Sequence, residues 1–217
     1  MTNSNPLNNQ PAPLVLRAAA VMFLLLLQGC ASLDKNECMV ADWRLIGYQD
    51  GVAGKSPTAM GEYRKDCAKH AVVPDLDAYR AGRAEGLQQY CKADTGYQLG
   101  NSGRGLSTVC PPHLSTEFRA AYEQGREIFL ARTAVKRTHA QIHKRQEVLE
   151  LLEEDKSYQL SELVSDGLRS EQRVLILYEI SKLEQKSNNI EDEIAELEDE
   201  LYEQQQYLNL LTQQASR

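Results

Sequence analysis

The chain has 217 residues and a formal net charge of −7, with 42% hydrophobic and 6% aromatic side chains. This length is enough for one modest hydrophobic core with an extension. Because no basic tract offsets the acidic balance, we predict no nucleic-acid partner. After residue 30, no apolar run is long enough to cross a membrane as a helix.

The N-terminal residues have the layout of a secretory signal. Arg17 precedes an apolar run over residues 18–27, which suits a signal peptide but is too short to span a bilayer. The run ends in Leu27-Gln28-Gly29-Cys30, which resembles the lipobox of bacterial lipoproteins. In that family the chain is cleaved before the cysteine, which then carries several acyl chains, enough for stable anchoring. We therefore predict a cleaved signal peptide over residues 1–29 and lipidation at Cys30.

The residue after Cys30 bears on the destination of the protein. Residue 31 is Ala and not Asp, and by resemblance to the sorting rules of enterobacterial lipoproteins this implies the outer membrane. We expect a lipid-anchored protein on its periplasmic face, with residues 30–37 as the lipidated N-terminus and tether. The alternative is an ordinary signal peptide in which Cys30 occurs by chance.

Four further cysteines follow, at positions 38, 67, 91 and 110. Export would place them in an oxidising compartment, which predicts two disulfides. Of the three possible pairings we favour Cys38–Cys67 and Cys91–Cys110, because each closes a short local loop. The competing interpretation is a zinc site, since Cys67-x-x-His70 and Cys110-x-x-His113 repeat one spacing. That site would leave Cys38 and Cys91 unpaired, so we predict neither a metal nor a cofactor.

Residues 38–115 are predicted to form a domain rich in cysteine, glycine and tyrosine. A Tyr-x-x-Gly pattern recurs at Tyr48, Tyr79, Tyr97 and Tyr122. On a helix, positions i and i+3 share a face, so the tyrosine can fill space while the glycine admits a neighbouring backbone. We interpret the pattern as helix packing, and a ligand-binding aromatic face is the alternative.

Local signals place the helix ends in this region. Residues 74–79 predict a helix start, with Asp75 or Asp77 near the free N–H groups and an end near Lys92. Residues 95–112 contain four glycines and two prolines and predict mostly turn and loop. Residues 115–118, Ser-Thr-Glu-Phe, predict the capped start of a long helix.

Residues 116–217 have the pattern of a coiled coil. Eleven positions alternate steps of four and three, and nine of them are apolar. These seam positions are Ile176, Ile180, Leu183, Ser187, Ile190, Ile194, Leu197, Leu201, Gln204, Leu208 and Leu211. A weaker copy repeats every seven residues at Ile128, Val135, Ile142 and Leu149. Gly167, between the two patterns, predicts a helix break.

Folding the chain near Gly167, so that paired residue numbers sum to about 333, places Arg145 and its basic neighbours opposite the acidic residues 191–200. It also brings Val135 near Leu197. Exposed ion pairs of this kind select orientation more than they add stability. We predict an antiparallel hairpin with arms of about 45 residues, each near 65 Å long. A parallel homodimer would place the acidic residues against themselves, although self-association through the coiled coil stays open.

The fold class that follows is mainly α. We expect a small disulfide-braced domain of helices and loops over residues 38–115, followed by a long antiparallel coiled-coil hairpin over residues 116–217.

No combination of residues typical of an enzyme is present. Residues 100–105 lack the spacing of a nucleophile elbow or a P-loop, and we prefer a flexible turn there to an anion site near Arg104. His139 and His143 have a metal-binding spacing but lie in a basic stretch, so we assign them to the hairpin surface. We interpret Asp50 as a helix-terminal cap. We therefore predict no catalytic site.

A longer set of residues carries a family resemblance. It runs Cys38, Trp43, Gly47-Tyr48-Gln49-Asp50-Gly51, Cys67, Tyr79-x-x-Gly82-x-x-x-Gly86-Leu87, Tyr90-Cys91, Gly96, Gly100, Gly103, Cys110-Pro111 and Phe118-x-x-x-Tyr122-x-x-Gly125. This order resembles a family of uncharacterised proteobacterial lipoproteins defined by a domain of unknown function, DUF2799. The resemblance covers roughly residues 38–130 and implies a lipobox, the cysteine framework and a helical C-terminal extension, but no activity. Leu106 stands where the family commonly has an aromatic residue.

Together these features predict a membrane-anchored envelope lipoprotein with a structural or protein-interaction role. The exposed face of the hairpin would bind an envelope protein partner. The alternative is a periplasmic module that binds a small ligand or glycan through tyrosine and tryptophan faces, which would have to be exposed. An enzyme comes third, because a reactive cysteine would have to be unpaired.

Overall fold

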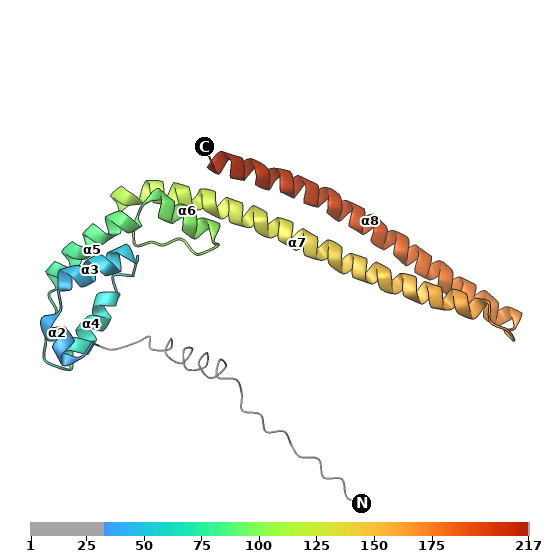
Figure 1. The fold of residues 1–217 in the computed structure, drawn as a ribbon, viewed down its shortest axis with the longest axis horizontal. Helices are drawn as coiled ribbons and strands as arrows, with labels where there is room; N and C mark the ends of the chain where they lie inside the picture. The colour runs from blue at the N-terminus through green and yellow to red at the C-terminus, as the bar shows by residue number, and fades with distance from the viewer. Residues whose placement is uncertain (1–32, 217) are drawn as a thin grey trace, which may run out of the picture. The chain divides into compact units, whose positions relative to one another are not determined.

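The structure is a computed structural model that describes residues 33–216, and all regular structure within these residues is helical (Figure 1). Cys30 and the predicted signal peptide lie outside the described residues. The helices in chain order are α2 (Lys35–Val40), α3 (Trp43–Val52), α4 (Ala59–Ala68), α5 (Leu76–Tyr90), α6 (Ala93–Asn101), α7 (Pro112–Leu163) and α8 (Ser170–Ala215). The predicted mainly α class, with two disulfides and a helical hairpin, is confirmed. None of the described helices is long and apolar enough to cross a membrane.

Contacts divide the chain into two compact units, with the boundary between Gly86 and Leu87. In the first unit, helices α2 to α5 enclose a core of Cys38, Trp43, Met60, Cys67 and Tyr79. Cys38 and Cys67 form a disulfide with a Cα–Cα distance of 5.5 Å. This bond joins α2 to α4, so a core too small to be stable alone is braced covalently.

Polar residues begin three helices of the first unit. Asp34 and Glu37 cap α2 reciprocally, each side chain accepting from the backbone N–H of the other at 2.8 Å. Asp42 accepts from the N–H of Leu45 at 3.0 Å and so caps α3. Asp75 accepts from the N–H of Ala78 at 2.9 Å. The predicted start of α5 at this aspartate is therefore confirmed, and the helix ends close to the predicted position.

The second unit corrects the prediction of mostly loop over residues 95–112. Residues 93–101 form helix α6, and the loop covers only residues 102–111. Gly96 and Gly100 are buried within α6, where they allow α7 to come close. Gly103 has a φ of 74° and terminates this stretch as a true turn glycine. A disulfide from Cys91 to Cys110, with a Cα–Cα distance of 5.7 Å, closes the loop.

Helix α7 begins earlier than predicted. Its first residue is Pro112, and neither Pro111 at the N-cap nor Ser115 caps it by a side chain. The hydroxyl of Ser115 instead donates to the carbonyl of Pro112 at 3.0 Å. Proline has a backbone angle already suited to the first turn of a helix and lacks the N–H that would be unpaired there. The predicted Ser-Thr cap is therefore wrong, because the prolines start the helix instead of ending a loop.

Helices α7 and α8 run antiparallel along their length and form the predicted hairpin (Figure 1). The break falls at residues 164–169, and Gly167 has a φ of 85°. All eleven predicted seam positions of α8 are buried or half-buried. The heptad pattern therefore identified the contact face of α8 correctly.

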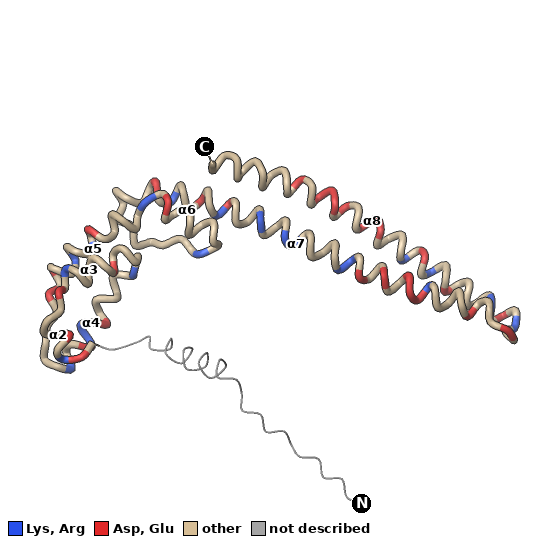
Figure 2. The backbone as a smooth tube through the Cα atoms, in the orientation of Figure 1, with Lys and Arg blue, Asp and Glu red and all other residues tan. Residues whose placement is uncertain are grey.

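The axial alignment of the two arms differs from the predicted one. Arg145 contacts Glu193 at 2.8 Å, not residue 188, and Thr138 donates to the side chain of Gln204 at 3.0 Å, not to residue 195. A heptad pattern fixes the face of each helix but not its axial shift. The shift follows from the turn, where Arg173 donates to the carbonyls of Leu163 and Ser165. The predicted facing of charges is still present at Arg145 and Glu193, and Figure 2 shows the acidic residues gathered in the middle of α8.

Candidate functional site

A buried carboxylate lies at the centre of the first unit. Asp50 is 3% exposed and sits within α3, so the prediction of a helix-terminal cap is wrong. The hydroxyl of Tyr79, from α5, donates to its Oδ2 at 2.9 Å. The hydroxyl of Tyr63, from α4, donates to Oδ1 at 3.3 Å, and Nζ of Lys55 lies 2.7 Å from the same oxygen. We call these four residues the Asp50 cluster.

Burial and the neighbouring Asp50 carboxylate shift the pKa values of the three donors in the Asp50 cluster. Burial, followed by the hydrogen bond to Asp50, raises the pKa of Tyr79 far above its usual value. Burial, followed by the charge of Asp50 and the hydrogen bond to it, raises the pKa of Tyr63. The hydrogen bond to Asp50 raises the pKa of Lys55. At neutral pH both phenols therefore keep their protons and the amine is charged, so all three donate to the carboxylate. A carboxylate that already accepts from three donors is suited to holding residues 53–58, which connect α3 to α4, in place. It is less suited to acting as a free base.

Glycines bring α3 and α5 into backbone contact. A Cβ at Gly47 would lie 2.0 Å from the carbonyl oxygen of Tyr79. A Cβ at Gly82 would lie 1.9 Å from that of Arg44. Real Cβ atoms are never this close to a carbonyl, so only glycine allows the two helices to pack at this separation.

The second unit uses the same device between α6 and α7. A Cβ at Gly100 would lie 2.1 Å from the carbonyl oxygen of Tyr122, and one at Gly125 would lie 2.2 Å from that of Tyr97. The Tyr-x-x-Gly pattern is thus a helix-packing motif in both units, which confirms the packing interpretation.

The two units share more than this motif. Residues 47–51 read Gly-Tyr-Gln-Asp-Gly and residues 96–100 read Gly-Tyr-Gln-Leu-Gly. In each unit the arginine after the second motif donates to a backbone carbonyl of the loop that follows the first, Arg83 to Lys55 at 2.7 Å and Arg126 to Gly103 at 3.3 Å. Leu99 stands where Asp50 stands. The helix pair therefore does not need a carboxylate at this position, and Asp50 is a feature particular to the first unit.

Most aromatic side chains of the two glycine-packed helix pairs are buried or half-buried, and of those in residues 38–125 only Tyr48 is exposed, at 38%. Trp43, Tyr79, Phe118 and Tyr122 are all buried among core residues. Leu106, which replaces an aromatic residue expected from the family resemblance, packs against the core of the second unit. These positions count against a glycan-binding face, which would need such rings exposed.

The cysteines and histidines within residues 33–216 do not come together as a metal site. The structure pairs Cys38 with Cys67 and Cys91 with Cys110, so no thiolate of these four is available to zinc. Among the described residues, no group of three potential ligands comes together. His143 is exposed and lies 3.3 Å from Glu147 on the hairpin surface, as predicted.

The loop after α6 is anchored and does not form a free turn. The carbonyl of Arg104 accepts from the Tyr122 hydroxyl at 2.9 Å, and the carbonyl of Gly103 accepts from Arg126. The prediction of a flexible turn is wrong, because these two side chains from α7 hold its backbone.

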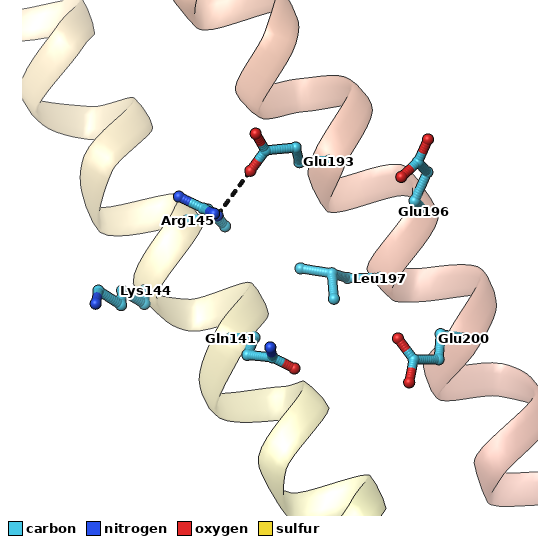
Figure 3. A pocket seen from close by; sticks show the side chains of 7 residues that line it. All are labelled: Gln141, Lys144, Arg145, Glu193, Glu196, Leu197 and Glu200. Atoms are coloured by element: carbon cyan, nitrogen blue, oxygen red, sulfur yellow. Dashed lines mark ion pairs between the residues drawn. The ribbon is translucent and has the colours of Figure 1, made fainter.

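A hollow of about 390 Å³ opens between the arms of the hairpin (Figure 3). Half-buried Arg145 lines it three residues after the seam residue Ile142, at the spacing that continues the α7 seam. Arg145 extends toward Glu193 on α8, and Leu197 points from α8 toward α7. The other lining residues are Gln141, Lys144, Glu196 and Glu200. The hollow is therefore a place where the apolar seam is interrupted, and one of its carboxylates, Glu193, already pairs with Arg145.

The turn of the hairpin carries a concentration of exposed apolar side chains. Seven large apolar residues near it are between 46% and 78% exposed. They are Tyr158, Leu160, Val164, Val174, Leu175, Leu177 and Tyr178, and we call them the apolar tip. Grouped apolar exposure of this kind marks interaction surfaces on folded proteins.

Residues 42–127 match the model of a family described as a protein of unknown function, DUF2799. The match covers most of the region over which the resemblance was predicted. It includes both glycine-packed helix pairs and ends within the first part of α7, so most of the hairpin lies outside it. Comparison with curated proteins and with solved structures found no match.

Proposed function

We propose that this chain is a lipid-anchored envelope protein with a structural or interaction role, in which the apolar tip of the hairpin is the binding surface. The observation that carries the proposal is the exposure of the seven side chains of the apolar tip. In an isolated hairpin these exposed side chains lower the solubility of the protein. A partner surface that covers them would remove this cost and explain why they are there.

The anchor is supported by the apolar run that ends in Cys30 and by the cysteine pairing. Two disulfides fit a chain that folds in an oxidising compartment. Under this proposal Cys30 is acylated, the protein resides at the periplasmic face of the outer membrane, and the partner is an envelope protein. We propose no enzymatic activity, because the buried carboxylate of Asp50 already accepts from three donors.

The anchor is tested by metabolic labelling with a fatty acid, followed by separation of inner and outer membranes. We expect label on the full chain in the outer-membrane fraction and none on the Cys30→Ala variant. An unlabelled wild-type protein would contradict the anchor without affecting the proposed role of the apolar tip.

The interaction role is tested by shortening the hairpin. Removing residues 157–177 and joining the shorter arms by a glycine-serine turn should abolish crosslinks between this protein and its envelope partner. A variant with Tyr202 and Tyr207 replaced by serine, both exposed on α8 far from the turn in sequence, should retain them. Crosslinks that persist without the tip would place the binding surface elsewhere.

A further inference from the structure

The folded part of the first unit begins close in sequence to the proposed lipid anchor. Leu33 is the first described residue, and it already packs against the core that contains Cys67. A hydrogen bond from Lys69, and a weaker one from the backbone of Leu33, hold the pKa of Asp66 on α4 below its usual range. Cys30 is three residues before Leu33, and three residues of fully extended chain span at most about 11 Å.

An acyl anchor at Cys30 would therefore hold one end of the first unit at the membrane surface. Acyl chains attached to a cysteine lie among the lipid chains, which leaves the cysteine itself near the boundary between lipid chains and headgroups. The headgroup layer of one leaflet is about 5–8 Å thick. A link of at most about 11 Å keeps Leu33 within the headgroups or just outside them. The end of α4 that Leu33 contacts must then lie against lipid.

A hollow of about 500 Å³ lies beside this end of α4, and we call it the α4 hollow. The residues that line it include Gly61, Arg64, Lys65, Ala68, Val73 and Pro74. The first four share one face of α4, because helix positions three and four apart are neighbours. A Cβ at Gly61 would meet nothing within 4 Å, so this face of α4 is open.

The total charge at this end of the unit is balanced, so the position of each charge decides what can bind. Residues 33–40 and 59–74 contain four lysines or arginines and four aspartates or glutamates. Two of the acidic side chains cap α2, and Asp66 pairs with Lys69 at 2.7 Å. The fourth, Glu62, is exposed and does not line the α4 hollow.

Two cations at the α4 hollow have no such partner. Arg64 and Lys65 are exposed, and neither forms an ion pair with any residue from 33 to 216. The described lining of the hollow contains both of them and no acidic residue. Val73 lines the same hollow and is 87% exposed. Cations beside an exposed apolar side chain suit a surface that is anionic outside and apolar beneath.

The same end of the unit carries a second strongly exposed valine. Val40 is the last residue of α2 and is 81% exposed. The Cys38–Cys67 disulfide joins α2 to the end of α4 (Figure 1). Among the large apolar side chains that the structure describes, Val73 and Val40 have the two highest exposures. Both therefore occur at the end of the unit that the anchor would hold at the membrane.

We propose that this end of the first unit lies on an anionic phospholipid surface, with Val40 and Val73 inserted between the headgroups and a lipid phosphate bound by Arg64 and Lys65 in the α4 hollow. The contact rests on the proposed acylation of Cys30 and deepens it, because it names the surface of the folded unit that meets the membrane and the lipid that this surface prefers. Each arginine or lysine near an anionic membrane strengthens binding about fivefold.

The test uses the full acylated chain, reconstituted into vesicles whose lipids carry bromine high on the acyl chains. A fluorescent amino acid replaces Val73 in one variant and Val52 in the matched control. Val52 is also an exposed valine of the first unit, but it lies at the end of α3 farther from α2. Bromine quenches a fluorophore only at close range. In vesicles of phosphatidylcholine and phosphatidylglycerol, we expect quenching at position 73 and none at position 52.

Charge is tested in the variant that carries the fluorophore at position 73. Arg64→Gln together with Lys65→Gln should lower the ratio of docked to undocked units about twentyfold. Quenching should then fall to the level found in phosphatidylcholine alone. Lys136→Gln together with Arg137→Gln removes the same charge from an adjacent exposed pair on α7 and should leave the quenching unchanged. An equal loss in both double variants would overturn phosphate binding in the α4 hollow.

Mass spectrometry of the purified chain separates failure of this contact from failure of the anchor. A chain that carries acyl groups and floats with the vesicles, but shows no quenching at position 73, would overturn the contact and leave the anchor standing. A chain without acyl groups would overturn the anchor and the contact with it. Equal quenching at position 73 with and without phosphatidylglycerol would overturn the preference for an anionic lipid.

Discussion

The hydroxyl of Tyr79 donates to Oδ2 of Asp50 at 2.9 Å, in a part of the first unit where both residues are at most 3% exposed. In the second unit the corresponding positions hold Tyr122 and Leu99, and the tyrosine donates to the carbonyl of Arg104. One helix pair thus buries a charge where the other buries an apolar side chain. Burying a charge in place of an apolar group rarely adds stability. We therefore assign the Asp50 cluster the role of fixing the position of residues 53–58, which connect α3 to α4.

The first prediction compares how much two substitutions in the Asp50 cluster lower the free energy of unfolding. Lys55→Met should lower the free energy of unfolding by about 3 kcal/mol, because it leaves the buried Asp50 carboxylate without its cation. Asp50→Leu should lower it by only about 1–2 kcal/mol, because it leaves hydroxyls of Tyr63 and Tyr79 unpaired but removes the buried charge. Urea denaturation of both variants measures the difference. A larger loss for Asp50→Leu would show that the carboxylate itself stabilises the fold.

The second prediction concerns alkaline pH. The pKa values of Tyr63, Tyr79 and Lys55 are all raised in the folded protein. Below the unfolded value of 10.0 for tyrosine, both states hold the same protons and the stabilisation is complete. Above it the unfolded chain loses protons that the folded one retains, so the free energy of unfolding should fall as pH rises. In a Tyr79→Phe variant, followed by circular dichroism as the pH is raised, this fall should be shallower. An unchanged dependence of stability on pH would contradict the contribution assigned to Tyr79.

The third prediction concerns the glycine contacts. Gly100→Ala would place a Cβ 2.1 Å from the carbonyl of Tyr122, so α6 and α7 must separate. We expect a loss of about 3 kcal/mol or failure to fold. Gly61→Ala is the matched control, because it also lies within a helix but has nothing within 4 Å of its Cβ. It should stabilise the protein by about 0.5–1 kcal/mol through helix propensity. Thermal unfolding that ranked the two variants equally would argue against the close packing.

How much the sequence predicts depends on whether the signal is local. The α8 seam, the break at Gly167 and the start of α5 at Asp75 are local or periodic, and all three were predicted. Helix α6 was missed because Gly96 and Gly100 favour turns in isolation. They are tolerated in a helix only because α7 packs against them, and that contact is not visible in the local sequence.

The Asp50 cluster was not predictable for a related reason. Its members Lys55, Tyr63 and Tyr79 come from different elements, and their spacing in the chain matches no motif. The one available signal was the comparison of residues 47–51 with residues 96–100, where an aspartate replaces a leucine within an otherwise identical sequence. The axial shift of the hairpin was also beyond the heptad pattern, since it depends on the geometry of the turn.

The fourth prediction concerns the disulfides. Thiol titration of the denatured, unreduced protein should find no free thiol among Cys38, Cys67, Cys91 and Cys110. Replacing both Cys38 and Cys67 by serine opens a loop with a sequence separation of 29 residues and should lower the free energy of unfolding by about 2–5 kcal/mol. Four free thiols per chain in the wild type would contradict the pairing and restore the zinc interpretation.

The fifth prediction concerns Arg145, which interrupts the apolar seam of the hairpin. Its ion pair with Glu193 is nearly half exposed on both sides, and pairs of this kind contribute about 0–1 kcal/mol. A leucine at the same position would lie over the hollow beside Leu197 and bury apolar area there. Arg145→Leu should therefore raise the free energy of unfolding of the hairpin by about 1 kcal/mol. Lys144→Leu, which lines the same hollow from an exposed position, should give no gain, and equal gains would show that burial in the seam is not the cause.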